Sequence, residues 1–278
     1  MTGPLLSVVI ANYNYGRFLE EAICSVLNQG VNDEVELIVC DAGSSDGSVE
    51  IIQKYQDRIS WWCSERDRGQ SDAFNKGFSH ARGKYLTWLN ADDVFTPGAL
   101  RAVLTAMKKH PECEWFAGSS LYADKDLRVE DCFCAHRFSV LRAKYAFLSV
   151  GGPSSFFSKR IYQAVGGINE SLHYAMDVDL WLRFYHDLHI TYRRVIHNVW
   201  AYRRHENSKM SGIDCNPTDK AIEDRRKATI ESDALDAKYG VRHGFKYNLV
   251  QIVSYSIIDG LIVWWRNMRW RGRSALEI

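Results

Sequence analysis

Short apolar runs alternate with amphipathic segments along the first hundred residues. Residues 7–11 are apolar and rich in β-branched side chains, and in residues 18–27 apolar positions recur three and four apart. Further strand-like runs occupy residues 35–40, 59–63 and 85–89. Strands that alternate with helices predict an α/β fold with a mostly parallel sheet flanked by helices. In such a sheet, ligands gather where the strands end.

The pattern is less regular after residue 98. Helices are predicted over residues 99–108 and 177–185, and strands over residues 115–122 and 192–199. No internal repeat or low-complexity segment is present, so the second half extends the same fold.

The composition is that of an ordinary folded protein. Its 278 residues carry a formal net charge of +1, which gives no reason to expect a nucleic-acid partner. The seven cysteines are an odd number scattered through apolar runs, as is typical of buried thiols in a reducing compartment. The N-terminus shows neither the basic region nor the apolar stretch of a secretory signal, so we expect a cytoplasmic location.

The C-terminal stretch has a different character. Residues 248–265 are mostly apolar, with polar residues on one narrow helical stripe, and a basic run follows over residues 266–273. Asp259 near the middle makes a membrane-spanning helix unfavourable. A wide apolar face with a basic flank suits peripheral contact through residues 244–273 with the inner face of the cell membrane. The alternative is a core or homodimer helix with a solvated basic tail.

Polar residues follow the ends of the predicted strands and can converge on one ligand, because parallel strands end at one edge of a sheet. Two adjacent carboxylates after a buried strand are costly to keep ionised without a cation, so Asp92 and Asp93 predict a metal and phosphate site. The alternative is that they only cap the turn before Pro97. The polar residues concerned are Asn12, Tyr13, Asp41, the run 66–72, Asp92 and Asp93.

Several blocks resemble, in order, the blocks of glycosyltransferase family 2, over about residues 5–210. They are the opening segment 7–29, the aspartate-and-glycine turn 41–48, the block 68–77, the Asp-x-Asp-type metal motif 89–93 and the acceptor-side acidic motif 175–183. The metal motif departs from the family pattern at Asn90, where many relatives carry the first acid. An amide oxygen can still ligate a hard cation, but it brings no charge.

The resemblance implies a GT-A fold, which is Rossmann-like, and inverting transfer of a sugar from a nucleotide-diphosphate donor. The expected donor is a UDP-sugar, and the expected acceptor is a glycan or lipid-linked molecule of surface polysaccharide or glycoconjugate assembly. Mg²⁺ or Mn²⁺ would assist. The implied catalytic domain covers residues 1–212, with the donor half at 1–98 and the acceptor half at 99–212, and a helical extension covers residues 213–278.

Carried over position by position, the resemblance also implies individual roles. Asp177 would be the general base, Asp93 would ligate the cation, and His205 would reach the metal or the diphosphate. Residues expected to hold the nucleotide sugar are Asn12, Tyr13, Asp41, Asp46, Arg68, Asp72, Asn90 and Asp92.

The residue types suit this chemistry. Asp177 begins a predicted helix, where the helix dipole favours an ionised base, whereas Asp179 points about 200° away on the same helix. Asp177 could instead be only an N-cap. The cluster 202–208 could be solvated charge, or its arginines 203 and 204 could clamp phosphate oxygens. Trp181 is expected to pack in the core rather than stack on an acceptor.

Other functions fit the sequence less well. A sugar-1-phosphate nucleotidyltransferase or a dinucleotide-dependent oxidoreductase would want a glycine-rich phosphate loop after the first strand, and residues 11–14 are not one. The remaining alternative is a catalytically silent nucleotide-sugar-binding or scaffold protein of a membrane assembly complex.

Overall fold

The computed structural model of the chain describes residues 3–138, 150–206, 208, 219–240, 265 and 268–278. Its strands are β1 (Leu6–Asn12), β2 (Val35–Asp41), β3 (Trp61–Ser64), β4 (Tyr85–Asn90), β5 (Val94–Phe95), β6 (Trp115–Ala123), β7 (Val129–Phe133), β8 (Ser155–Ser158) and β9 (Arg193–Arg203). Within the described ranges they form one nine-stranded sheet in the order β3-β2-β1-β4-β8-β6-β9-β5, with β7 beside β6.

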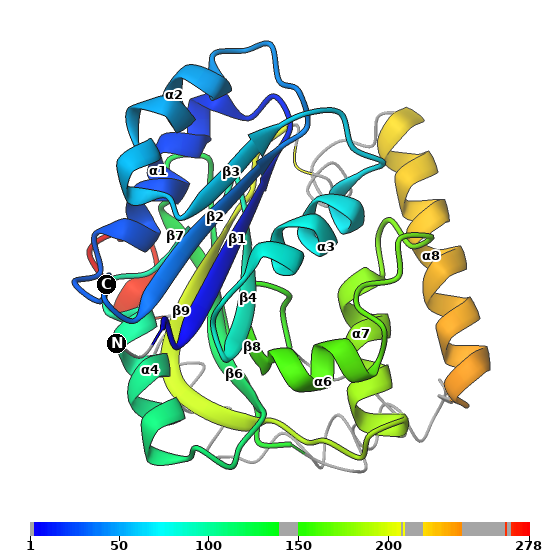
Figure 1. Cartoon of the computed structure of the whole chain (residues 1–278). Coiled ribbons are helices and arrows are strands. Elements are labelled where there is room, and N and C mark those ends of the chain that lie inside the picture. The colour runs from blue at the N-terminus through cyan, green and yellow to red at the C-terminus, as the bar shows by residue number, and fades with distance from the viewer. Residues whose placement is uncertain (1–2, 139–149, 207, 209–218, 241–264, 266–267) are drawn as a thin grey trace.

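Helices cover both faces of this sheet, as Figure 1 shows. They are α1 (Gly16–Leu27), α2 (Ser48–Lys54), α3 (Gln70–His80), α4 (Ala99–Lys109), α6 (Lys159–Ala164), α7 (Met176–His186) and α8 (Asp219–Tyr239), with a 3₁₀ turn at Gln56–Arg58. Helices α1, α2 and α4 pack on one face, and α3, α6 and α7 pack on the other. The predicted α/β class with helices on both faces is therefore confirmed.

Parallel pairing occurs in the N-terminal half of the sheet and again between β6 and β9. Strands β3, β2, β1 and β4 are all parallel neighbours, and Ala11 of β1 lies between Cys40 of β2 and Asn90 of β4. The carboxyl ends of these strands therefore meet at one edge, as the sequence pattern predicted. Beyond β4 the short strands β8, β7 and β5 pair antiparallel, which the sequence analysis did not predict.

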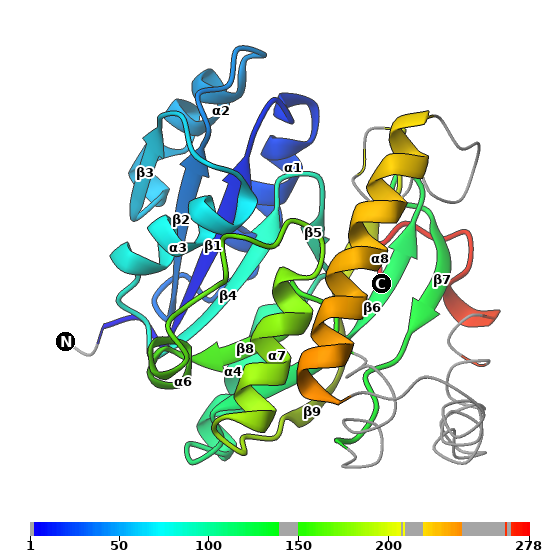
Figure 2. The same ribbon diagram turned by 90° about the vertical axis from the view of Figure 1, so that its right-hand side faces the viewer.

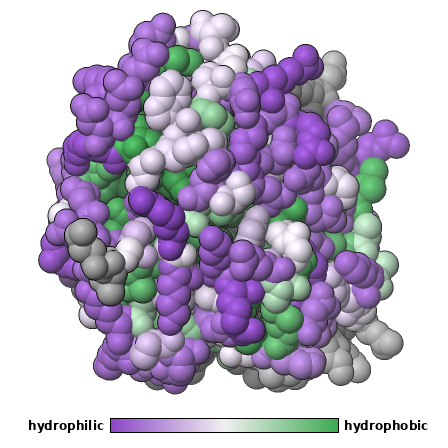
Figure 3. Space-filling view, viewed as in Figure 1, coloured by the Kyte–Doolittle hydropathy of each residue, from purple (hydrophilic) through white to green (hydrophobic). Residues whose placement is uncertain are grey.

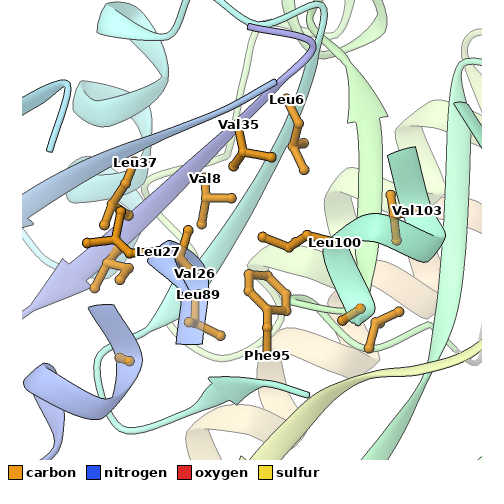
Figure 4. Packing of buried hydrophobic residues seen from close by; sticks show 14 of the residues in the cluster. Leu6, Val8, Val26, Leu27, Val35, Leu37, Leu89, Phe95, Leu100 and Val103 are labelled. Atoms are coloured by element: carbon orange, nitrogen blue, oxygen red, sulfur yellow. The ribbon is translucent and has the colours of Figure 1, made fainter. Parts of the chain in front are cut away.

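The continuous apolar run of β1 is explained by burial on both faces. Alternate side chains point to opposite faces of a strand, so Leu6 and Val8 pack toward α1 and α4 while Val9 packs toward α3. Figure 4 shows the first of these two layers, in which strand residues meet Leu100 and Val103 of α4. A buried side chain of this size contributes about 1.5–3 kcal/mol relative to an exposed one.

Aromatic rings fill the other face. Trp181 of α7 stacks on Trp88 of β4 with ring centroids 5.6 Å apart, and its centroid lies 5.3 Å from that of Trp115 in β6. Trp181 is fully buried, so the expectation that it packs in the core is confirmed.

The C-terminal part contacts the rest of the chain in two places. Helix α8 runs beside α7, as both Figure 1 and Figure 2 show. Near the end of the chain, Gly272 N donates to Val129 O (2.7 Å), and Val129 N donates to Arg273 O (2.8 Å). Ala275 donates to Leu127 O and is completely buried. Residues 272–275 thus add to the edge of the sheet at β7.

In the described part, no helix combines the length and the apolar character needed to cross a membrane. The face in Figure 3 is mostly hydrophilic, with hydrophobic residues in small groups. Of the predicted apolar segment 248–265, residues 248–264 lie outside the described residues. The cysteines at positions 24, 40, 63, 113, 132 and 134 are free thiols, as expected.

Candidate active site

A cavity of about 800 Å³ opens where β1 and β4 end. Its walls also include the loop before α3, the turn at residues 152–153, the start of α7 and the end of β9. This volume lies within the range of ligand pockets, and the location is the strand edge at which α/β proteins bind ligands.

The expected site residues divide into two groups. Asn12, Tyr13, Asn90, Asp92 and Asp177 line the cavity. The others do not line it: Asp41, Asp46, Arg68, Asp72, Asp93 and His205. They contact the surrounding loops and residues outside the cavity lining.

Asp41 organises the loop between β2 and α2. Its carboxylate accepts hydrogen bonds from Asn12 Nδ2 (2.6 Å), Ser64 Oγ (2.6 Å), Ser44 and Gly43. Burial opposes its ionisation, but the hydrogen bonds outweigh burial and lower the pKa of Asp41 below its ordinary value. Asp41 therefore orients Asn12, whose Oδ1 is buried without a partner among the described residues.

Asp46 joins the first two loops of the site. Its Oδ2 accepts from Gly16 N at 2.7 Å, and its Oδ1 accepts from the hydroxyl (2.6 Å) and N–H of Ser48. The carboxylate thus ties the start of α1 to the start of α2. Tyr13, which lies between β1 and α1 in the chain, has a ring that is 61% solvent-accessible.

Arg68 and Asp72 pair with each other. Arg68 Nη2 lies 2.9 Å from Asp72 Oδ1 and 2.6 Å from Glu170 Oε2, and its side chain is mostly exposed. Helix α3 begins at the cavity because Gly69, at φ 124°, adopts a backbone conformation that other residues rarely take. This start brings Gln70 rather than Arg68 to the cavity wall.

Asp92 and Asp93 are neighbours in sequence but point to different surroundings. Asp92 lines the cavity, and its Oδ2 lies 3.1 Å from Nε2 of His205. Asp93 is completely buried, and its carboxylate accepts from Asn90 Nδ2 (2.8 Å) and Arg203 N (2.9 Å). Burial, reinforced by the charge of Asp92, raises the pKa of Asp93 well above its ordinary value.

Asn90 is part of the same hydrogen-bond chain. Its Oδ1 accepts from Gln70 Nε2 at 2.7 Å, while its Nδ2 donates to Asp93. A side-chain amide can accept a hydrogen bond through its oxygen and donate one through its nitrogen. A carboxylate at position 90 would instead face the carboxylate of Asp93, so the departure from the family pattern has a structural reason here.

Neither of the two arginines at the end of β9 lines the cavity. Arg203 is buried, donates from Nε to Asp92 O (2.8 Å) and pairs with Glu21. Arg204 pairs with Glu130. The expectation that one of them clamps phosphate oxygens stays a prediction.

Asp177 lies in the first turn of α7 and lines the cavity half-buried. The helix N-cap is Ala175, so Asp177 is not the N-cap residue. Asp179 is turned away, buried against Arg183 at 2.7 Å, in agreement with the expected 200° separation.

Sequence reasoning did not single out several residues of the cavity. Arg66, an exposed side chain after β3, is the only arginine or lysine among the lining residues that the structure describes. Asp67 lines the same wall, and burial raises its pKa. Both lie within the run 66–72. The position of this run directly after a predicted strand was the sequence feature that could have identified them. Tyr15, His173, Tyr174 and Tyr202 had no comparable signal.

A divalent cation fits one position in this arrangement. The described residues include no group of three or more His, Cys, Asp or Glu side chains placed to hold a metal ion. They do include the Asp92–His205 pair, one carboxylate beside one imidazole. The carboxylate suits a hard cation such as Mg²⁺ or Mn²⁺ that takes its remaining ligands from a diphosphate and water, and an imidazole is a common ligand of transition metals.

The sheet order, the two helical layers and the strand-end cavity define the GT-A class of glycosyltransferase folds. Structure comparison agrees. Staphylococcus aureus TarS (residues 1–349), solved in complex with UDP-GlcNAc, matches with a TM-score of 0.60 and 19% identity, over 81% of this chain and 66% of TarS. The mannosyltransferase PcManGT of Pyrobaculum calidifontis, solved with GDP-Man and Mn²⁺, matches with a TM-score of 0.54 and 14% identity, over 95% of this chain and 84% of PcManGT.

Residues 7–127, somewhat less than half of the chain, match the model of glycosyl transferase family 2. An uncharacterized glycosyltransferase of Rickettsia prowazekii is 28% identical over 66% of this chain and 59% of its own length. Chondroitin synthase of Escherichia coli is 27% identical over 76% of this chain and 31% of its own length. The chain spans about three fifths of the length of the relatives from Rickettsia prowazekii and Rickettsia typhi.

Proposed function

We propose that this chain is an inverting glycosyltransferase that moves a sugar from a nucleotide-diphosphate donor to a hydroxyl of an acceptor. The observation that carries the proposal is the shared cavity. Asn12 at the end of β1, Tyr13 directly after it, Asp92 after β4, and Asp177 of α7 all line it. Residues suited to a base, a diphosphate and a proton thus surround one space.

The donor nucleotide would lie at the end formed by β1 and β2. The exposed ring of Tyr13 can stack on a base, and the unpartnered Oδ1 of Asn12 can accept a hydrogen bond from one. Asp41 and Asp46 would act by holding this loop. We infer a UDP-sugar, which the UDP-GlcNAc complex of TarS supports, and the GDP-Man complex of PcManGT makes a GDP-sugar the comparison to test.

The diphosphate would lie near Asp92 and Arg66. We propose that Asp92 and His205 hold Mg²⁺ or Mn²⁺, and that Asp93, originally expected as the ligand, supports Asn90 and Arg203 from behind. When bound, the cation would neutralise charge that develops on the departing diphosphate. Arg66 adds a positive charge at the same wall.

Asp177 would accept the proton of the acceptor hydroxyl. As the hydroxyl oxygen bonds to the anomeric carbon, the bond from that carbon to the diphosphate oxygen breaks, and the proton passes to the Asp177 carboxylate. Attack opposite the leaving group inverts the anomeric configuration. The position of Asp177 in the first turn of α7 favours its ionised form, which is the form a base needs.

The acceptor would be a glycan or a lipid-linked sugar. The relationship to chondroitin synthases and a hyaluronan synthase supports a place in polysaccharide or glycoconjugate assembly. We also propose peripheral contact with the inner face of the cell membrane through residues 244–273. Trp265 and Met268 are exposed there, and Arg269 lies over the Trp265 ring.

Donor hydrolysis and transfer test the function. The full chain would be incubated with UDP-GlcNAc, UDP-glucose or GDP-mannose, with and without Mn²⁺, and release of nucleotide diphosphate would be measured. We expect release from a UDP-sugar, stimulated by Mn²⁺ and lost in Asp177→Asn when an acceptor glycan is present. Asp187→Asn, an exposed acid at the other end of α7, is the matched control. Donor binding without release from any donor would favour the silent binder instead.

Membrane contact is tested by point variants, because residues 272–275 pair with β7 and their deletion would damage the fold. We expect Trp265→Asp combined with Arg269→Glu to reduce sedimentation with vesicles that contain anionic lipid. Arg160→Glu, which makes the same charge change as Arg269→Glu on the exposed surface of α6, is the control. Equal sedimentation of the Trp265/Arg269 variant and the wild type would contradict the membrane proposal.

A further inference from the structure

Helix α8 contacts the segment that leads into the proposed catalytic base. The carboxylate of Glu231 accepts three consecutive backbone N–H groups: His173 on Oε1 (2.9 Å), and Tyr174 (2.8 Å) and Ala175 (2.9 Å) on Oε2. His173 and Tyr174 line the cavity, and Asp177 follows two residues after Ala175. One side chain from the C-terminal part therefore holds the backbone of a cavity wall.

The start of α7 depends on this contact. Its N-cap residue is Ala175, whose side chain cannot accept a hydrogen bond from the helix. Glu231 accepts from the N–H groups just before the helix, and an unpaired polar group that is not fully solvated is costly. Burial opposes ionisation of Glu231, but these three hydrogen bonds outweigh it and lower the pKa of Glu231 below its ordinary value.

A second tether lies two turns away on the same face of α8. Tyr174 donates its hydroxyl to Asp224 Oδ1 at 2.6 Å. Positions 224 and 231 are seven apart, so they face the same side of a helix. Apolar contact between α8 and this region centres on Leu235 against Ala175 and Leu182, with Leu172, Val178 and Tyr239 packed beside them. The hydrogen bonds of Glu231 and Asp224 add a directional tether to this apolar contact.

We propose that Glu231 is a positioning residue for Asp177, so that α8 completes the active site rather than merely extending the chain. The inference rests on the proposed role of Asp177 as the base. Because the three hydrogen bonds fix residues 173–175, they fix where α7 begins and hence where the Asp177 carboxylate points. Misplacement of a reacting group by about 1 Å can cost roughly a hundredfold in rate.

Glu231→Gln tests the geometry with little change of shape. The amide oxygen can replace only one carboxylate oxygen, so the amide NH₂ must face a backbone N–H that it cannot satisfy. We expect kcat for sugar transfer to fall at least tenfold, while the Kd for UDP with Mn²⁺, measured by calorimetry, stays within about twofold. Glu223→Gln is the matched control, because Glu223 lies on the same helix and pairs only with Arg226 and Lys227 in the contacts described.

Asp224→Ala provides an independent variant that leaves Glu231 in place. It removes the acceptor of the Tyr174 hydroxyl, and we expect a smaller fall of kcat, about threefold or more, again with unchanged UDP affinity. If Glu231→Gln does not fold, as shown by its melting curve, Asp224→Ala decides the question with the same two measurements.

The outcomes separate this inference from the proposed function. Wild-type kcat in Glu231→Gln, together with an inactive Asp177→Asn, overturns the inference and leaves the function standing. A parallel fall of kcat, UDP affinity and melting temperature also overturns it, because the role of Glu231 would then be general stability. Wild-type transfer by Asp177→Asn contradicts the proposed function itself.

Discussion

The imidazole Nε2 of His205 lies 3.1 Å from the carboxylate Oδ2 of Asp92, although 113 residues separate the two in sequence. The ring of His205 also packs against Phe18, with centroids 4.7 Å apart, so the pair is held from behind. Asp92 is the member of this pair that lines the cavity. We therefore place the proposed cation-binding position at Asp92.

We predict that Asp92→Ala lowers Mn²⁺-dependent nucleotide release by about 10²–10³-fold, because it removes the carboxylate that would hold the cation at the departing diphosphate. Its melting temperature should fall less than that of Asp93→Ala, since it removes the partner of one buried group, His205 Nε2, whereas Asp93→Ala removes the acceptor of two. Release would be measured over a titration of Mn²⁺. A variant with unchanged rate and unchanged half-saturation by Mn²⁺ would rule out this assignment.

Asp93→Ala should act on stability. It leaves Asn90 Nδ2 and Arg203 N without their acceptor, and each unsatisfied buried group costs about 1–3 kcal/mol. Urea unfolding of this variant beside Asp92→Ala measures the contrast. Should Asp92→Ala be the more destabilised of the two, the division of roles between these neighbours is incorrect.

Tyr13→Ala should weaken binding of the nucleotide by about 1–3 kcal/mol, the usual contribution of one base stacked on an aromatic ring. Because the ring is 61% exposed in this structure, the melting temperature should hardly change. Calorimetric titration with UDP in the presence of Mn²⁺ gives the affinity. Tyr13→Phe, which keeps the ring, is the control and should bind UDP like the wild type.

Arg66→Ala should reduce affinity for UDP more than affinity for uridine, since the proposed partner of Arg66 is the diphosphate. The effect should shrink as salt is raised, because exposed charges are screened. Arg68→Ala is the matched comparison: Arg68 is two residues away and pairs with Asp72 and Glu170. Equal losses in the two variants would mean that Arg66 has no special role.

Glu36 makes stability depend on pH. It accepts hydrogen bonds from Ser7 Oγ (2.6 Å) and from Arg82 N and Nε, and these outweigh burial and lower its pKa. A carboxyl group whose pKa is lower in the folded state than in the unfolded state stabilises the fold. Its contribution is complete at pH values above the unfolded pKa, about 4.3, and is lost as the pH falls through the folded pKa.

Glu36→Gln should therefore be less stable than the wild type by about 1–3 kcal/mol near pH 7. The difference should narrow as the pH falls from about 6 to about 3. Free energies of unfolding from urea titrations across this range provide the measurement. A gap between wild type and variant that stays constant with pH would show that the ionised form of Glu36 is not what stabilises the fold.

The N-terminal half of the fold could be predicted because its signals are local. Each buried strand is a short apolar run and each helix repeats at three and four, so β1 to β4 follow from the pattern. Strand β5 has two residues, and β8 begins within a glycine-rich turn. Strands this short carry no periodicity of their own, and they exist because longer strands already provide hydrogen-bonding edges.

The site was predicted in part for a related reason. Residues after long strands could be expected at the cavity, as Asn12, Tyr13 and Asp92 show. His173 and Tyr174 reach it through a loop that α8 holds, and that contact spans more than fifty residues. Nothing in the local sequence around residue 173 indicates it.

The sequence by itself determined the order of strands and helices, the convergence of polar strand ends, and the family blocks with their aspartates. Only the tertiary structure decided which aspartate faces the cavity. Asp92 and Asp93 are joined by one peptide bond, so sequence places them together but leaves their directions open. Those directions depend on two residues at the end of β9 and just after it. His205 pairs with the Asp92 carboxylate at the cavity wall, and the backbone N–H of Arg203 donates to the buried carboxylate of Asp93.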